Sequence, residues 1–143
     1  MTNFSQPKLY TRTTKWYSLA YLAFIAFTSS TLVITTILGT YEDSDVSGVE
    51  VIRSGAMAVV GIAAIVGISL DKAWSRWAAI ATYGCFVFVL IEGFVNSLLA
   101  DSALTMALNS SELIAFRGLR IVMIIPALEG VGLLMEKRSA DHA

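Results

Sequence analysis

The sequence predicts an all-α integral membrane protein, with four transmembrane helices in an antiparallel bundle. The chain of 143 residues is 56% hydrophobic and only 15% charged, whereas a soluble domain carries about 25% charged residues. Its mean hydropathy is +0.70. The charged residues are also concentrated between four long apolar segments, so these segments are the expected elements of the fold.

The four predicted helices cover approximately residues 16–39, 51–70, 77–99 and 113–136. The first contains no charged residue, the third is interrupted only by Glu92, and the apolar run 119–134 within the fourth contains a single acid, Glu129. A helix needs about 20 residues to cross the hydrocarbon core, and it satisfies its backbone hydrogen bonds internally. The first segment is longer than the apolar core of a signal peptide, which spans about 7–15 residues, so we expect a retained helix. Residues 1–143 are predicted to form a single transmembrane domain.

The connection between the third and fourth helices has features of its own. Asp101 is suited to begin a short helix that lies at the membrane interface before the fourth helix. Asn109 and Glu112 have the spacing of a capping box, in which two residues three positions apart bind each other's backbone amides. This pair predicts where the fourth helix begins.

The distribution of lysine and arginine predicts the orientation in the cell membrane. With both termini in the cytoplasm, the outer side holds only Arg53, Arg117 and Arg120. The cytoplasmic side then holds seven basic residues, namely Lys8, Arg12, Lys15, Lys72, Arg76, Lys137 and Arg138. Because basic residues accumulate on the cytoplasmic side, we expect a multi-pass protein with both termini inside.

Glu92 is one of two carboxylates expected within the membrane, where ionisable groups are costly and usually paired. Asn96 lies one turn further along the same helix face. Arg120 is expected at a similar depth in the fourth helix, so a Glu92–Arg120 pair would neutralise both charges and join two helices. Two roles remain open for Glu92, either half of a structural ion pair or a site for a proton or cation.

Glu129 is the second such carboxylate, and no basic residue is expected at its depth. It lies nine residues from Arg120, which places the two on opposite faces of a regular helix. Pro126, one turn earlier, removes a helical hydrogen bond and is expected to kink the helix. The predicted partners of Glu129 are first-helix hydroxyls, those of Thr28, Ser29, Ser30 and Thr31. A proton carrier and a hydrogen-bond donor between helices are both open roles.

Small residues on the second helix predict close contacts with neighbours. They fall on two faces at helical spacing, one with Ala56, Ala63 and Gly67, the other with Ser54, Ala58 and Gly61. Small residues at such spacing allow helix backbones to approach closely in membranes. The second helix is therefore expected to be central or to contact another chain.

The sequence lacks the residues that several kinds of catalytic and metal-binding site require. The only histidine is His142, near the C-terminus, and the only cysteine is Cys85. Haem ligation, zinc binding and Ser-His-Asp catalysis each need side chains that this composition does not offer. We therefore expect no enzyme activity, no cofactor and no metal. The net charge of −1 argues against a nucleic-acid partner, which favours a basic face.

Two functional hypotheses remain. The first is a non-catalytic subunit of a larger membrane protein complex, which packs through small-residue helix faces. Its partners are the lipid bilayer and other membrane subunits or copies of itself. The alternative is a small homo-oligomeric transporter or channel that uses its intramembrane carboxylates.

Overall fold

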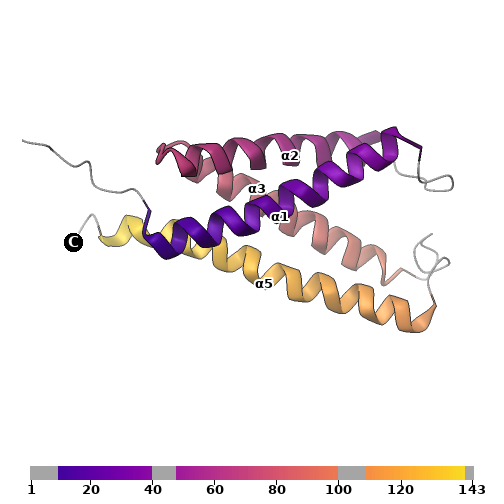
Figure 1. Ribbon diagram of the computed structural model, residues 1–143. Helices are drawn as coiled ribbons and strands as arrows, with labels where there is room; N and C mark the ends of the chain where they lie inside the picture. The colour runs from indigo at the N-terminus through magenta and orange to yellow at the C-terminus, as the bar shows by residue number, and fades with distance from the viewer. Residues whose placement is uncertain (1–9, 40–47, 100–108, 141–143) are drawn as a thin grey trace, which may run out of the picture. The chain divides into compact units, whose positions relative to one another are not determined.

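The computed structural model describes residues 10–39, 48–99 and 109–140, and the side chains up to residue 136. Within these ranges there are helices and no strands (Figure 1). The helices are α1 (Arg12–Ile37), α2 (Gly48–Ser69), α3 (Ser75–Asn96) and α5 (Ser110–Ala140). All four are long and apolar enough to cross a membrane. This result confirms the prediction of an all-helical chain with four long apolar helices.

The first and last helices begin earlier than approximately residues 16 and 113 because polar residues cap them. The Thr11 side chain accepts a hydrogen bond from the Thr14 amide at 3.2 Å. The Asn109 side chain accepts one from the Glu112 amide at 2.9 Å, and the Glu112 carboxylate accepts one from the Asn109 amide at 3.0 Å. These two bonds confirm the predicted capping box. The predicted interfacial helix falls on residues 100–108, outside the described residues.

The chain divides into two compact units, unit 1 (Met1–Thr82) and unit 2 (Tyr83–Ala143). In unit 1, α1 packs against α2 (Figure 1). Contacts along α1 follow the reverse order of those along α2, because Lys15 reaches Ser69 while Ala26 lies opposite Gly61. A β-carbon on Gly61 would lie 3.5 Å from carbons of both Ala26 and Thr82. The second helix therefore meets α1 and the first turns of α3 at a glycine.

The turn from α2 to α3 is a Schellman motif, a helix ending in which one residue adopts a left-handed conformation. The Lys72 amide donates to the Gly67 carbonyl at 2.8 Å, and the Asp71 amide donates to the Ile68 carbonyl at 3.2 Å. Asp71 has φ 51°, in the left-handed region that aspartate tolerates better than most residues. A β-carbon on Gly67 would lie 2.9 Å from the Trp74 ring, so the turn is closed by an aromatic side chain packed on a glycine.

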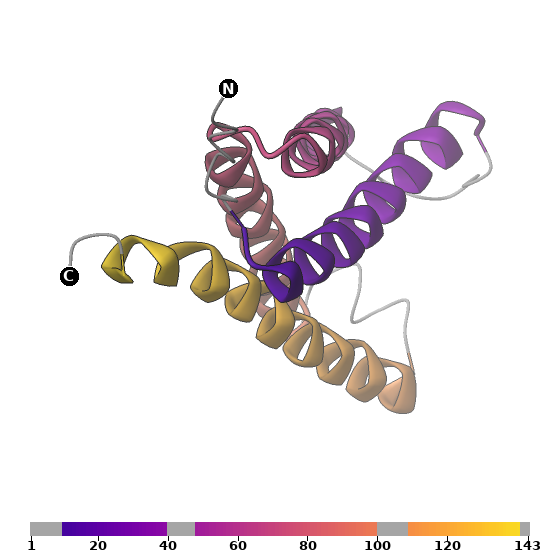
Figure 2. The same cartoon turned by 60° about the vertical axis from the view of Figure 1, so that its left-hand side comes forward.

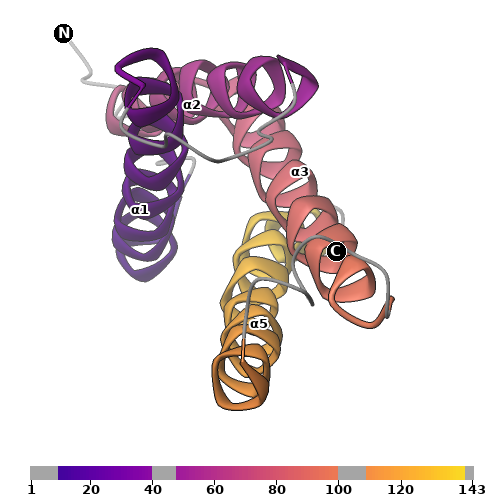
Figure 3. The same cartoon turned by 90° about the vertical axis from the view of Figure 1, so that its right-hand side faces the viewer.

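Unit 2 consists of α5 and most of α3, which can be followed in Figures 2 and 3. Arg117 reaches Ser97, whereas Gly130 lies against Tyr83. A β-carbon on Gly130 would lie 2.8 Å from Cζ of Tyr83, which is fully buried. The order of contacts along α5 is therefore the reverse of that along α3, and a glycine again provides room at a close approach.

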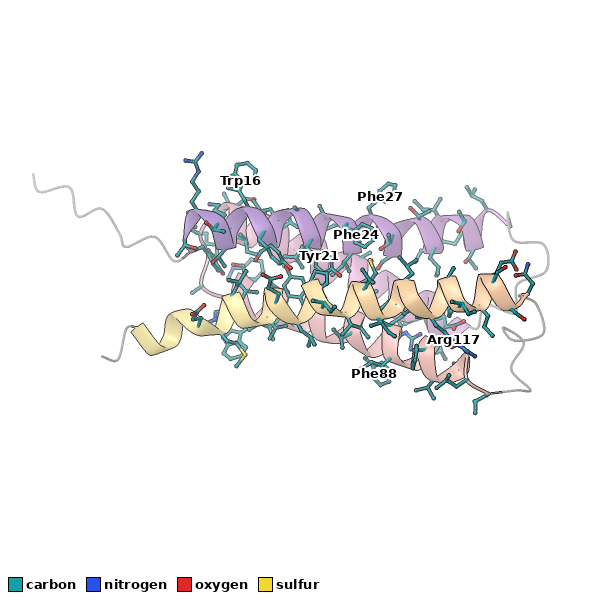
Figure 4. All side chains as sticks on the ribbon, turned by 90° about the horizontal axis from the view of Figure 1, so that it is seen from below. Trp16, Tyr21, Phe24, Phe27, Phe88 and Arg117 are labelled. Atoms are coloured by element: carbon teal, nitrogen blue, oxygen red, sulfur yellow. The ribbon has the colours of Figure 1, made fainter. Side chains whose placement is uncertain are left out.

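The outer surface of the helices is strongly apolar. Trp16 is 65% exposed and Phe27 is 72% exposed, and both project from the α1 ribbon in Figure 4. In the most apolar 18-residue stretch of each helix, only 17% to 33% of the residues are buried. Most residues in these stretches are thus not buried by the described parts of the chain.

Candidate functional site

Arg120 on α5 is held against the backbone of α3. Its Nη1 donates to the Val89 carbonyl at 3.1 Å, and the Leu90 carbonyl lies 3.5 Å away. A β-carbon on Gly93 would overlap the guanidinium group. The ring of Phe116 covers the guanidinium from another side, with Cζ of Arg120 4.2 Å from the ring centroid. A backbone carbonyl, a glycine and an aromatic face therefore position one cation between two helices.

Glu92 lies beside this arginine. It is half-buried on α3, next to Gly93, and its carboxylate interacts electrostatically with the Arg120 guanidinium. The structure thus brings the two predicted partners close together, and a direct ion pair between them stays a prediction. Asn96, at the end of α3, is exposed.

Arg117 forms a second cross-link that sequence reasoning missed. Its Nε donates to Oγ of Ser97 at 3.1 Å, and its Nη2 donates to the Ser97 carbonyl. Ser97 is fully buried, follows the last residue of α3, and donates its hydroxyl to the Phe94 carbonyl at 2.6 Å. Carbonyls at a helix C-terminus lack helical partners and favour cations. The available signal was the spacing of three residues between Arg117 and Arg120, which places both on one helix face.

The second predicted carboxylate, Glu129, has a different environment. α5 continues through Pro126, and Glu129 is exposed. Ala127 and Gly130 beside it are buried. Glu129 therefore lies on the outer side of α5, while Arg120 reaches toward α3.

The α1 hydroxyls that were predicted to meet Glu129 belong to unit 1, so that contact joins the two units and stays a prediction. The Thr28 hydroxyl donates to the Phe24 and Ile25 carbonyls, both at 3.0 Å, and the Thr31 hydroxyl donates to the Phe27 carbonyl at 2.9 Å. Ser29 is buried and Ser30 is half-buried. Because the threonine hydrogens are already engaged within α1, these two hydroxyls are available mainly as acceptors.

A buried hydrogen-bond chain in unit 1 was also missed. Ser75 donates its hydroxyl to the Lys72 carbonyl at 2.6 Å, and the Tyr10 hydroxyl lies 2.7 Å from Ser75 Oγ. Since the only hydroxyl hydrogen of Ser75 is engaged with Lys72, Tyr10 must be the donor to Ser75. Burial raises the pKa of Tyr10 above its usual value, although the Ser75 bond and Arg76 act against that shift. This chain ties the segment before α1 to the turn between α2 and α3.

Lys15 reinforces the same junction. Its Nζ donates to the Asp71 carboxylate at 3.2 Å and to the Ser69 carbonyl at 3.1 Å. Ser69 is the last residue of α2, so the lysine places a positive charge at the negative end of that helix. Both links depend on residues more than 50 positions apart, which explains why helical spacing did not reveal them.

The contacts of Arg117, Arg120 and Lys15 therefore link separate helices or the ends of helices. Among the described residues, no three histidine, cysteine, aspartate or glutamate side chains are gathered as a metal site requires. Cys85 is a free thiol and is exposed.

Comparison with known proteins assigns neither a family nor a function to the chain. No protein-family model, no curated protein sequence and no solved structure matches the chain.

Proposed function

We propose that the chain is an integral membrane protein with four spans and both termini in the cytoplasm, and that it acts as a non-catalytic subunit of a larger membrane assembly. The apolar outer surfaces of α1, α2, α3 and α5 support membrane insertion, because exposed apolar surface is unfavourable in water by about 25 cal/mol per Å². The reversed order of contacts between α1 and α2, and between α3 and α5, supports an antiparallel arrangement.

The orientation can be tested with single cysteines in a Cys85→Ser background. Ser47 and Ser102 are predicted to be outside, and Lys72, which is exposed in the turn between α2 and α3, is predicted to be inside. On intact cells, an impermeant thiol reagent should label cysteines at positions 47 and 102 and leave position 72 unlabelled. Labelling only at position 72 would reverse the orientation.

The observation that carries the subunit role is the outer face of α5. This face repeats at alternating steps of four and three residues, and every member is exposed. We call it the α5 outer face: Ile114, Gly118, Ile121, Ile125, Leu128, Gly132 and Met135. Such spacing forms one continuous stripe that is suited to pack against another helix.

The two glycines of the α5 outer face favour a protein partner over lipid. Gly118 and Gly132 have open space where a β-carbon would be, so no contact with the described residues requires them. Glycine costs a helix about 1 kcal/mol relative to alanine. Small residues instead let a second helix approach closely in a membrane.

A bulky residue on the α5 outer face tests this role. We expect Gly132→Leu to leave the chain folded and inserted in the membrane but to reduce the size of the assembly on a native gel. The matched control is Gly84→Leu, at another exposed glycine with open space around it, on α3. Normal assembly of Gly132→Leu, together with loss of assembly in Gly84→Leu, would assign the interface to α3 instead.

A further inference from the structure

The end of unit 1 that contains the α2–α3 turn concentrates positive charge. We call it the turn end, made of residues 10–16 and 69–77, and the links from Tyr10 and Lys15 to this turn hold the two segments together. In Figure 1 the start of α1 and this turn lie on the left. Lys15 and Asp71 pair with each other at 3.2 Å. Asp71 is the only acid in the two segments, which also contain three further basic residues, Arg12, Lys72 and Arg76.

Two of these residues, Arg12 and Lys72, are exposed on the surface. Arg76 is half-buried and close enough to Tyr10 to interact with it electrostatically. Arg12 lies three residues before Lys15, on the same face of α1. The cations from two segments therefore lie around one junction.

The helix dipoles add to this positive field. Both α1 and α3 begin at the turn end, and neither has an acidic residue in its first turn. Helix N-termini carry a partial positive charge, which favours acidic residues there. The positive charges of Arg12 and Arg76 are therefore unfavourable at these helix starts. By contrast, α2 and α5 have Glu50 and Glu112 in their first turns. An anion bound at the turn end would remove this conflict.

Exposed tryptophans accompany the cations. Trp74 is 51% exposed, and Trp16 and Trp77 are each 65% exposed. Tryptophan is enriched where a membrane protein passes through the lipid headgroups, because its ring is apolar and its N–H is polar. The combination of exposed indoles with the exposed cations Arg12 and Lys72 matches a surface that contains both acyl chains and phosphates, whereas a soluble anion offers only the charge.

We propose that the turn end binds the headgroup phosphate of anionic phospholipids. Arg12 and Lys72 supply exposed charge, Arg76 and the N-termini of α1 and α3 add to the field, and the tryptophans lie at the headgroup level. This inference rests on the proposed membrane insertion. It also assigns a task to the Lys15–Asp71 pair, which neutralises the one acid that would repel the phosphate.

The test measures lipid preference in nanodiscs that contain equal amounts of phosphatidylglycerol and phosphatidylcholine. After extraction in mild detergent, the purified protein should retain phosphatidylglycerol preferentially. An attraction of about 1 kcal/mol per basic residue near an anionic surface corresponds to about fivefold per charge. The Arg12→Gln/Lys72→Gln variant should therefore lose most of this preference, whereas the charge-retaining Arg12→Lys/Lys72→Arg control should keep it.

Several outcomes would overturn the proposal. These are equal retention of both lipids by the wild type, an unchanged preference in the glutamine variant, or loss of preference in the charge-retaining control. Replacement of chloride by inorganic phosphate at equal ionic strength should leave the lipid bound, and displacement would instead indicate a site for the free anion. Resistance to carbonate extraction reports membrane insertion separately, so an inserted protein without lipid preference refutes only this inference.

Discussion

The guanidinium group of Arg120 occupies the space where a β-carbon on Gly93 would lie. This relationship explains why a large cation can lie against a helix backbone and bind the Val89 carbonyl at 3.1 Å. Together with the Arg117–Ser97 contact, it fixes the register of α5 along α3 through hydrogen bonds that the two arginine side chains donate. The helix that carries the α5 outer face is thus positioned by two arginines.

Gly93→Ala should lower stability in detergent by about 1–2 kcal/mol, because the methyl group displaces the Arg120 side chain from its carbonyl partner and from Phe116. A gain in helix propensity of up to about 1 kcal/mol offsets part of the loss. The matched control Gly84→Ala, which adds a methyl group in open space, should be neutral or stabilising. Thermal unfolding followed by circular dichroism measures both. In an Arg120→Ala background the cost of Gly93→Ala should disappear, and persistence of that cost would show that the arginine does not cause it.

Glu92 and Arg120 are expected to be energetically coupled. Glu92→Gln and Arg120→Ala should each destabilise the protein, and the double variant should cost less than the sum of the two. Polar contacts between membrane helices average about 0.6 kcal/mol in such cycles, and an unpaired buried charge increases the cost of each single change. A double-mutant cycle of unfolding free energies in detergent measures the coupling. Strict additivity would mean that the carboxylate and the guanidinium do not interact.

Tyr10 provides a test that depends on pH. Burial raises its pKa, so the unfolded state ionises at a lower pH than the folded state does. Its contribution to stability is complete below pH about 10, the usual tyrosine value, and is lost as the pH rises through the pKa of the folded protein. The absorbance change at 295 nm, taken as wild type minus Tyr10→Phe, should show one tyrosine that titrates above its usual value. Titration at or below that value would contradict the buried Tyr10–Ser75–Lys72 chain.

Glu129 separates the subunit role from the transporter alternative. Glu129→Gln keeps the shape and a hydrogen-bond donor but cannot ionise. If the carboxyl serves only in packing, this change should leave assembly, stability and ion permeability of proteoliposomes unchanged within error. Glu129→Leu should be the damaging change. It should lower the free energy of unfolding by about 1–3 kcal/mol, because the hydroxyl groups predicted to bind Glu129 would lose their hydrogen-bond partner. A glutamine variant that assembles normally but loses a measurable ion flux would favour the transporter.

The helices were predictable because each is a local feature of the sequence. Apolar length located all four, and the spacing of Asn109 and Glu112 located the start of α5, as their paired hydrogen bonds confirm. The contacts between helices were harder to predict from the sequence. Arg120 was expected near Glu92, yet its bonds to the Val89 carbonyl depend on the absence of a side chain at Gly93, which no spacing rule expresses.

The junction of unit 1 was hidden for a similar reason. Tyr10 and Ser75 are 65 positions apart, and both are residue types that occur throughout the chain. Asp71 directly follows the second predicted helix (residues 51–70), but its left-handed backbone follows from how α2 ends, not from a glycine at that position. Only the folded arrangement shows that Lys15 meets the end of α2.

The most direct test of the subunit role is the composition of the particle that the protein forms in its own membranes. The tagged chain should be extracted in mild detergent, and its particle mass and polypeptides should be determined by native mass spectrometry. We predict at least one other membrane polypeptide in fixed ratio, which Gly132→Leu releases and Gly84→Leu retains. A particle that contains only copies of this chain, or a monomer, would contradict the account.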